Sequence, residues 1–232
     1  MPAGVNNEYN RVKWLKKTLS QIPQGLRILD AGAGEQQFKK LCSHLDYVAQ
    51  DFAQYEGKGD GKGLQTGNWD QSALDIICDI TNIHEPDESF DAIMCIEVLE
   101  HLPEPIKAIK EFSRLLKPDG LLIITSPFCS LSHFSPYHFY SGFNRYFYET
   151  HLTTYGFQIL ELEANGNFFE YMGQELRRIK SVSEKNAQDT PHLIERCAIR
   201  IVLKMLERFS NKDIGSDELL CFGYHVLARK GV

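Results

Sequence analysis

Arg27-Ile-Leu-Asp-Ala-Gly-Ala-Gly34 is the stretch of sequence that decides the fold. A short apolar run that breaks into glycines predicts a buried strand feeding a tight turn. Glycines directly after a strand let a ligand approach the backbone closely, and the helix that follows such a turn offers free N–H groups. The stretch therefore indicates a nucleotide-type ligand, although the pattern is short and weak evidence by itself.

Strands and helices alternate on both sides of this turn. An amphipathic helix is expected over residues 7–21, because apolar side chains recur there at helical spacing before Pro23. The other elements expected in the first half are strands at 47–51, 74–79, 90–96 and 121–125, and helices at 35–44 and 104–117. This alternation predicts an α/β fold, a Rossmann-like doubly wound sheet of mostly parallel strands covered on both faces.

The second half of the chain has a different character. Residues 128–150 are rich in aromatic side chains and histidine. Beyond them we expect strands at 157–163 and 220–228 and helices at 169–184 and 191–209; the second helix carries Leu193, Cys197, Ile201 and Met205 in one row. The 232 residues suit a single domain, 1–232, with an N-terminal helical segment 7–22, a cofactor-binding half 27–127 and a substrate-recognition and C-terminal half 128–232.

Acidic residues end the next two strands after the glycine turn. Asp51 follows that turn by about 20 residues, and a carboxylate there can accept hydrogen bonds from both hydroxyls of a ribose. Asp79 can accept from an adenine amino group while Ile80 packs on the ring. Three successive strands that end in a glycine turn, an acid and another acid make a much stronger pattern than any one of them.

With these motifs, the sequence resembles the class I S-adenosylmethionine-dependent methyltransferases of the small-molecule type. The resemblance rests on residues 28–34, 48–51, 78–80, 89–102 and 115–125. It implies S-adenosyl-L-methionine as cofactor and a seven-stranded sheet whose last strand is antiparallel. It also implies roles for seven residues: Asp30, Gly32 and Gly34 beside the amino-acid part of the cofactor, Asp51 at its ribose, Asp79 and Ile80 at its adenine, and Glu97 at the methyl-transfer end.

Two features depart from the family pattern. Gln36 stands where many members have a third glycine, so the following helix can start differently here. The glycine-rich segment 56–70 replaces a helix between the second and third strands, and we expect a mobile loop, either a flap over the cofactor or an exposed insertion.

The acceptor chemistry points to histidines and to the aromatic segment. Methyl transfer requires mainly that two reactants are positioned and water excluded, and a hydroxyl acceptor also needs a base. His101, His133 and His138 are candidate bases, although each could instead have a structural role. Substrate is expected at segment 128–150, and the candidate contacts are Tyr137, Tyr140 and Arg145; the alternative is that these aromatics only extend the core.

Composition excludes several classes of function. With 25 basic and 31 acidic residues the formal net charge is −6, and without a basic stripe no nucleic-acid partner is expected. No apolar run approaches the ~20 residues of a membrane span, so no membrane partner is expected, and the polar N-terminus favours a cytoplasmic protein. The six cysteines form no CxxC pair and read as reduced thiols. The fifth strand ends in Thr125-Ser126-Pro127 rather than in acids, so no metal is expected.

Three functional hypotheses remain. The leading one is methyl transfer to an oxygen or nitrogen atom of a small molecule, including metabolites of a sugar type. An NAD-dependent oxidoreductase or epimerase is disfavoured because a dinucleotide site wants GxGxxG, and Gly32-Ala-Gly34-Glu-Gln-Gln37 lacks the third glycine. A non-catalytic binding module with the same fold is disfavoured by the presence of Asp51 and Asp79, which such a module would not need.

Overall fold

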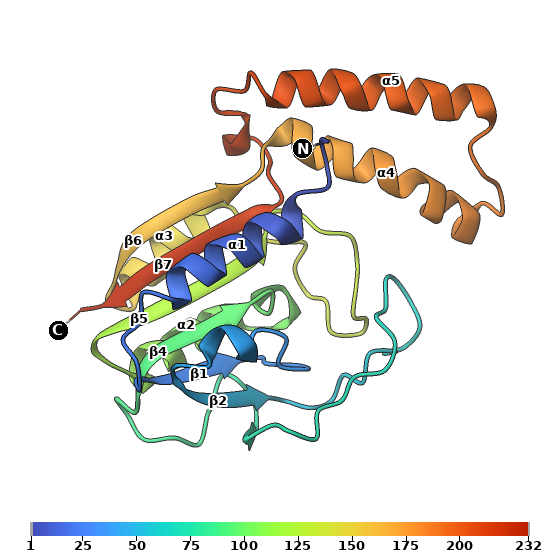
Figure 1. Cartoon of the computed structure of the whole chain (residues 1–232). Helices are drawn as coiled ribbons and strands as arrows, with labels where there is room; N and C mark the ends of the chain where they lie inside the picture. The colour runs from blue at the N-terminus through green and yellow to red at the C-terminus, as the bar shows by residue number, and fades with distance from the viewer. Residues whose placement is uncertain (1, 232) are drawn as a thin grey trace. The chain divides into compact units, whose positions relative to one another are not determined.

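A seven-stranded mixed sheet organises the chain, which the computed structural model describes over residues 2–231 (Figure 1). In chain order the strands are β1 Arg27–Ala31, β2 Asp46–Asp51, β3 Ile76–Ile77, β4 Phe90–Ile96, β5 Leu116–Pro127, β6 Phe157–Asn165 and β7 Gly223–Lys230. Their spatial order is β3-β2-β1-β4-β5-β7-β6. The first five pair in parallel and β7 is antiparallel to β5, which confirms the predicted Rossmann-like sheet.

The strand order reverses direction between β1 and β4. Strand β1 pairs with β2 on one side and with β4 on the other, so the connections after β1 and β4 leave in opposite directions. In open α/β sheets such a reversal leaves a crevice at the carboxyl ends of the strands, and ligands bind there. The topology therefore places the glycine turn after β1 beside the residues that follow β4.

Five α-helices and three short 3-10 helices are present in the described residues. They are α1 Asn7–Leu19, α2 Pro105–Leu115, α3 Arg145–Thr154, α4 Phe168–Asn186 and α5 Leu193–Ser210, with η1 Lys39–Cys42, η2 Leu99–His101 and η3 Ser216–Glu218. Helix α2 illustrates why such segments fold: Pro105 stands in its first turn, where the missing N–H costs nothing, and Ala108, Ile109 and Phe112 form one buried stripe.

Three elements differ from the expectations. The helix expected over 35–44 is reduced to turns and η1, and Gln36 takes the left-handed backbone angle φ 58° that a glycine would adopt freely. Strand β3 has two residues instead of six, and Ile77 is 65% exposed, because β3 ends the sheet and has only one partner strand. Helix α3 was not expected; Asn144 caps it by accepting from the Phe147 N–H (3.3 Å).

The core lies where α1 packs on the sheet. Trp14, Leu15 and Leu19 of this helix join one buried cluster with side chains that share one face of β1, β4, β5 and β7. The Trp14 ring also stacks on His225 at 5.0 Å, and its Nε1 donates to Glu161 Oε2 (3.2 Å). On the opposite face of the sheet the alternate side chains of β4, such as Ile93 and Cys95, are fully buried too. Burial on both faces is what a doubly wound sheet requires.

The chain forms two compact units. The sheet unit comprises residues 14–163 and 223–231, and the helical unit comprises residues 2–13 and 164–222. Residues of both expected functional halves, 27–127 and 128–232, lie in the sheet unit, because β7 returns into the sheet beside β5. Within the helical unit, Glu170 accepts from the Gly4 N–H (2.8 Å) and the Ser210 hydroxyl (3.1 Å), and Arg177 donates to the Ala3 carbonyl (2.8 Å).

None of the helices within residues 2–231 combines the length and apolar character that crossing a bilayer requires.

Candidate functional site

A cavity of about 520 Å³ opens at the carboxyl ends of the parallel strands in the sheet unit. The lining comes from the turn after β1, the end of β2 and the segment that follows it, the end of β3, the segment after β4, and the later aromatic segment 134–139. The lining residues are Gly32, Gln50, Asp51, Phe52, Gln54, Tyr55, Trp69, Ile77, Cys78, Asp79, Ile80, Glu97, Val98, His101, Leu102, Pro103, Phe134, Tyr137 and Phe139. Seven residues singled out from the sequence are among them: Gly32, Asp51, Asp79, Ile80, Glu97, His101 and Tyr137.

The glycine turn comes close to the backbone and side chains around it. Gly32 has φ +80°, and its N–H and that of Ala33 donate to the Gln50 carbonyl at 2.9 and 2.8 Å. A Cβ on Gly32 would lie 2.6 Å from Cγ2 of Val98, so no larger residue fits without movement. The turn thus exposes a bare backbone edge to the cavity, as close approach of a ligand requires.

Asp51 connects the turn to the second strand. Its carboxylate is buried and accepts from the Gly34 N–H (3.0 Å) through Oδ2 and from the Ala53 N–H (2.9 Å) through Oδ1. Backbone N–H donors hold this carboxylate in one orientation while it still has lone pairs for further hydrogen bonds. These contacts join the end of β2 to the glycine turn after β1.

Asp30 lies behind the turn and is not among the residues that line the cavity. The Tyr47 hydroxyl donates to its Oδ2 at 2.5 Å. Burial raises the pKa of Asp30 from 3.8 to about 7, although the hydrogen bond from Tyr47 lowers it, and the negative charge of Asp51 raises it further. Gly34 is also outside the lining set; a Cβ there would lie 2.9 Å from the Trp69 ring.

The two other acids of the cavity are held by hydroxyl groups. Asp79 Oδ1 accepts from the N–H and the hydroxyl of Thr81, both at 2.8 Å, and Ile80 beside it is buried. Glu97 has the left-handed angle φ 56°, and its Oε1 accepts from the Thr125 hydroxyl (2.8 Å). A non-glycine residue held in this region directly after a strand is a feature that clusters at ligand sites.

The three candidate histidines form one cluster. The His101 ring lies 4.7 Å from the ring of His133 and 5.9 Å from that of His138, and stacks on Phe134 at 4.9 Å. His101 Nδ1 lies 2.5 Å from the Tyr137 carbonyl oxygen, which can only accept, so Nδ1 carries the proton and Nε2 has the lone pair. Burial, with a contribution from His133, lowers the pKa of His101 to about 3.

Only one of the three expected substrate residues lines this cavity. Tyr137 is among the lining residues. Tyr140 instead donates from its hydroxyl to the Pro103 carbonyl (3.2 Å), and Arg145 pairs with Glu149 one turn along α3 (2.9 Å). His133 and His138 are also outside the lining set, although they pack against His101.

The glycine-rich segment forms a wall of the cavity. The Gly57 carbonyl accepts from the Thr66 and Gly67 N–H groups (3.0 and 2.9 Å), which folds the segment back on itself. The backbone of Leu64 then pairs with the 132–134 stretch: its N–H donates to the Ser132 carbonyl (3.0 Å), and its own carbonyl accepts from the Phe134 N–H (2.9 Å). The segment expected to be a mobile loop is therefore held by backbone hydrogen bonds on both sides.

Aromatic side chains missed by the sequence analysis complete this wall. Tyr55 stacks on Phe134 at 4.8 Å, and Trp69 meets the edges of both at 4.9 and 5.4 Å. The only signal in the sequence was the presence of large aromatics at the two ends of a glycine-rich stretch. Nothing there indicated that they would meet Phe134, which is more than 60 residues away along the chain.

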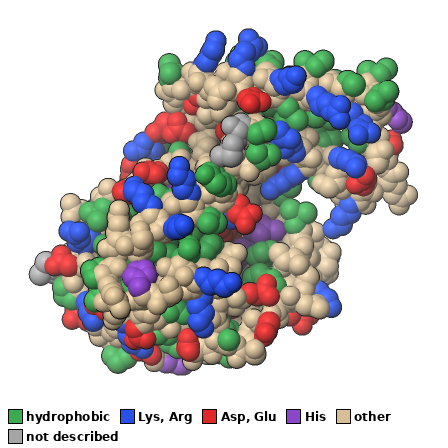
Figure 2. Space-filling view, viewed as in Figure 1, with side chains coloured by type: hydrophobic (Ala, Val, Ile, Leu, Met, Phe, Trp, Pro, Cys, Tyr) green, Lys and Arg blue, Asp and Glu red, His purple; other side chains and the backbone are tan. Residues whose placement is uncertain are grey.

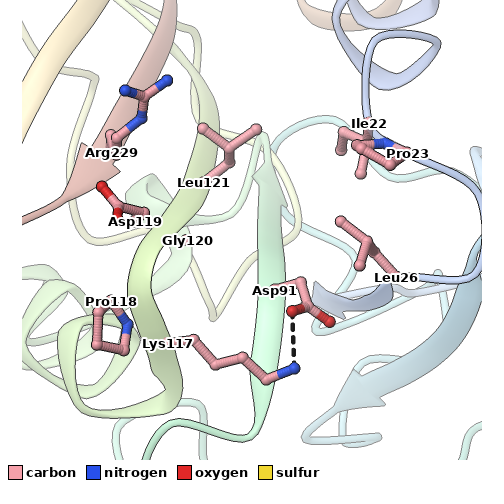
Figure 3. Close-up of a pocket in the computed structure, with 10 residues that line it drawn as sticks. All are labelled: Ile22, Pro23, Leu26, Asp91, Lys117, Pro118, Asp119, Gly120, Leu121 and Arg229. Atoms are coloured by element: carbon pink, nitrogen blue, oxygen red, sulfur yellow. Dashed lines mark hydrogen bonds and ion pairs between the residues drawn. The ribbon is translucent and has the colours of Figure 1, made fainter.

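A second cavity, of about 490 Å³, lies at the opposite edge of the sheet, where β4 and β5 begin (Figure 3). Asp91, one of the two acids that line it, pairs with Lys117 at 2.7 Å and also accepts from the Arg27 N–H at 2.9 Å. No residue that the sequence analysis predicted to act in the site lines this cavity. The carboxyl-end cavity is therefore the candidate site.

Comparisons with known proteins identify the family of the chain. A protein family described as a methyltransferase domain matches residues 6–181. The ubiquinone biosynthesis O-methyltransferase of Xanthomonas oryzae pv. oryzae is 33% identical over 109 residues, which are 44% of this chain and 43% of that protein. The enzyme of that name from Actinobacillus pleuropneumoniae is 28% identical over 109 residues, 44% of this chain and 46% of that protein. The chain thus matches less than half the length of these relatives.

Solved structures share the fold over almost the whole chain. A SAM-dependent methyltransferase from Archaeoglobus fulgidus has a TM-score of 0.59 at 18% identity and covers 97% of this chain and 94% of its own. Phosphoethanolamine N-methyltransferase 2 of Haemonchus contortus, in complex with S-adenosyl-L-methionine, has a TM-score of 0.57 at 18% identity, covering 97% of this chain and 53% of its own.

Proposed function

The chain belongs to the methyltransferase-domain family, and from this premise we propose that it is an S-adenosyl-L-methionine-dependent methyltransferase that methylates a small molecule. The observation that carries the proposal is the carboxyl-end cavity, in which the glycine turn and three carboxylates from three successive strand ends converge. The ubiquinone biosynthesis O-methyltransferases named above support a hydroxyl as the acceptor group.

The residues of the cavity fit the proposed cofactor. Asp51 would accept from the ribose hydroxyls, Asp79 and Ile80 would hold the adenine, and the bare backbone at Gly32 would admit the amino-acid part. No lysine or arginine is among the described residues that line the cavity, whereas Asp51, Asp79 and Glu97 make it acidic. An acidic cavity favours a ligand that carries positive charge. When bound, this cofactor supplies a methyl group on a positively charged sulfur.

The remaining wall suits a flat acceptor with a hydroxyl group. Phe134, Tyr137 and Phe139 present aromatic surface, on which a planar molecule packs favourably. His101 lies beside them. Its Nε2 is buried and has a lone pair; within residues 2–231 it makes no hydrogen bond, and it lies 3.8 Å from Oε1 of the buried Glu100. A neutral imidazole in this position could accept the proton of an acceptor hydroxyl as the oxygen attacks the methyl group. His133 and His138 would act through His101, by packing against its ring.

Calorimetry tests the cofactor assignment. Purified protein is titrated with S-adenosyl-L-methionine and with NAD, and the titrations are repeated with Asp51→Asn. We expect binding of the methyl donor, no signal with NAD, and affinity lower by about 10- to 100-fold in the variant, since hydrogen bonds to a charged group contribute about 1.5–3 kcal/mol each. Asp189→Asn, at an exposed position of the helical unit, is the matched control. Binding of NAD without the methyl donor, or unchanged affinity in Asp51→Asn, would overturn the proposal.

A second experiment tests the role of His101. Small catechols and other phenols are screened for methylation, and the wild type is compared with His101→Gln and His133→Gln. We expect His101→Gln to bind the cofactor normally but to lower kcat by about 10²- to 10⁴-fold, which is the usual contribution of a general base. His133→Gln, which leaves the Nε2 of His101 in place, should retain most of the activity. Equal losses in both variants would contradict the assignment of the base.

A further inference from the structure

Helix α5 of the helical unit has an inner face that is packed and an outer face that is not. On the inner face Leu206 is buried, and Ile199, Val202 and Leu203 are half-buried. Phe209 at the end of the helix contacts Phe169 of α4 at 5.4 Å between ring centres. These contacts account for the pairing of the two helices, and they leave the rest of the α5 surface to be explained.

The outer face carries large apolar side chains in water. Leu193 is 74% exposed, Ile194 is 83% exposed and Ile201 is 69% exposed. Leu193, Cys197, Ile201 and Met205 recur at every fourth position, so they form the row that the sequence predicted, but the row faces solvent instead of a core. A solvent-facing helix surface is normally polar, and a contiguous exposed apolar strip indicates an interaction surface.

A second row, of basic side chains, runs beside the apolar one. Arg196, Arg200 and Lys204 recur at every fourth position, each one residue before a member of the apolar row. Arg208 continues this series and lies over the ring of Phe209 at 5.0 Å, and all four basic residues are exposed. Within residues 2–231, no ion pair joins any of the four to an acidic side chain. On α4, in contrast, Arg178 pairs with Glu175 at 2.7 Å. Figure 2 shows basic and apolar side chains intermixed over the part of the molecule that contains α5 in Figure 1.

We propose that the outer face of α5 lies on an anionic phospholipid surface. A helix with an apolar strip beside a row of unpaired Arg and Lys binds in the plane of a membrane interface: the apolar side chains enter the boundary of the acyl chains, and the long basic side chains reach back to the phosphates. Each Lys or Arg near an anionic surface adds a favourable electrostatic attraction to the lipid phosphates, which acts together with burial of the apolar strip.

A second copy of this chain fits the same face poorly. If two α5 helices packed with their outer faces together, the basic row of one would lie against the basic row of the other, and like charges would oppose the contact. The charge of α5 also rules out a membrane span, because an 18-residue helix with four basic and two acidic residues cannot cross a bilayer. The sequence analysis expected no membrane partner, because no apolar run is long enough to span a bilayer, and the proposal departs from that expectation.

Vesicle flotation with the full chain tests this proposal. We would use vesicles of phosphatidylcholine alone and vesicles in which about one third of the lipid is phosphatidylglycerol. We expect binding to the anionic vesicles, at least about tenfold weaker binding to phosphatidylcholine alone, and release as salt is raised. The variant Ile194→Ser/Ile201→Ser removes apolar anchors and Arg200→Glu/Lys204→Glu reverses charges; each should weaken binding by about tenfold or more.

Two controls match these variants. Val5→Ser removes another exposed apolar side chain, 50% exposed, and Lys13→Glu/Lys16→Glu reverses two exposed charges on α1; neither should change binding. Because all substituted positions are exposed, circular dichroism should show every variant folded. The proposal is overturned if the wild type does not float with anionic vesicles, if only one of the two α5 variants loses binding, or if the controls lose as much. It is also overturned if light scattering shows that the wild type is a dimer that the α5 variants dissociate, which would assign this face to a second copy. Catalytic activity is not used, so the result is independent of the proposed function.

Discussion

Replacing Asp30 by asparagine should stabilise the protein, and the gain in stability should be larger at high pH than at low pH. The side chain is 3% exposed, directly behind the glycine turn, and its pKa is raised from 3.8 to about 7 mainly by burial. Asparagine has nearly the same shape and can still accept from the Tyr47 hydroxyl, which donates to Asp30 at 2.5 Å. The substitution therefore removes the ionisable group with little change in packing.

The direction of the pH effect follows from the two pKa values of Asp30. Between pH 3.8 and about 7, the folded protein keeps a proton that the unfolded chain has lost, so stability falls as pH rises through this window and stays reduced above it. With about 1.4 kcal/mol for each pKa unit, the raised pKa of Asp30 lowers the free energy of unfolding by about 2 kcal/mol at pH 5 and by about 4 kcal/mol at pH 8. The advantage of Asp30→Asn over the wild type should grow by about 2–3 kcal/mol between these two pH values.

Urea unfolding at pH 5 and pH 8 measures this difference. The free energies of unfolding of the wild type and Asp30→Asn are compared at each pH, and the constant cost of the extra amide donor cancels when the two differences are subtracted. Asp189→Asn, an exposed acid of the helical unit, is the control and should show no such growth. If the advantage of Asp30→Asn changed by less than about 0.5 kcal/mol between pH 5 and pH 8, Asp30 would titrate like an ordinary carboxylate and the burial argument would be refuted.

Three further predictions concern single residues of the sheet unit. Gly32→Ala should destabilise the folded protein by about 2–4 kcal/mol in thermal unfolding, because a Cβ at this position would lie 2.6 Å from Val98 in a backbone with φ +80°. The control is Gly25→Ala, which has the same φ and no atom within 4 Å of the added Cβ, and should cost only about 1 kcal/mol. Equal losses of stability in the two variants would rule out the steric cause. Arg114→Lys should lower the free energy of unfolding in urea by about 2 kcal/mol. Arg114 donates to both carboxylate oxygens of Glu111 (2.7 and 2.9 Å) and to the Ile83 carbonyl (2.9 Å), a set of contacts that lysine cannot reproduce. A variant as stable as the wild type would contradict this account. The wild type should lose stability as pH falls below 6.5, because the pKa of His101 is lowered to about 3 in the folded protein, so only the unfolded chain binds a proton at this residue. His101→Gln should lessen this loss. Unfolding midpoints of both proteins at pH 5 and pH 7 measure the effect, and an equal pH dependence would refute it.

Local sequence was sufficient for the elements whose pattern is strong. Strand β4 lies at 90–96 as predicted, because seven residues with apolar character and flanking turns have few alternatives. Strand β3 and the helix expected at 35–44 were predicted less well. The helix expected at 35–44 is reduced to turns and η1, since Gln36 in a left-handed conformation breaks the run and no local pattern announces this angle.

The candidate site divides in the same way. Gly32, Asp51, Asp79 and Glu97 could be placed from the sequence because each follows a strand that the sequence predicts, and the carboxyl ends of parallel strands meet at one edge. The positions of Tyr140 and Arg145 could not be placed. Tyr140 lies in an irregular segment, where its direction depends on the contact with Pro103, and Arg145 begins α3, a helix that was not expected, where it pairs with Glu149.

What the sequence by itself determined is the order of the strands along the chain, the glycine turn and the acids at the strand ends, because these depend on neighbours within a few residues of the chain. Only the tertiary structure decided how the segments 52–69 and 128–139 meet, since the contacts of Trp69 with Phe134 and of His101 with His133 join residues far apart in the chain. It also decided that the apolar row of α5 faces solvent. The helical period predicts that such a row exists, whereas the neighbours that cover or expose it are set by the packing of α4 against the other face of the helix.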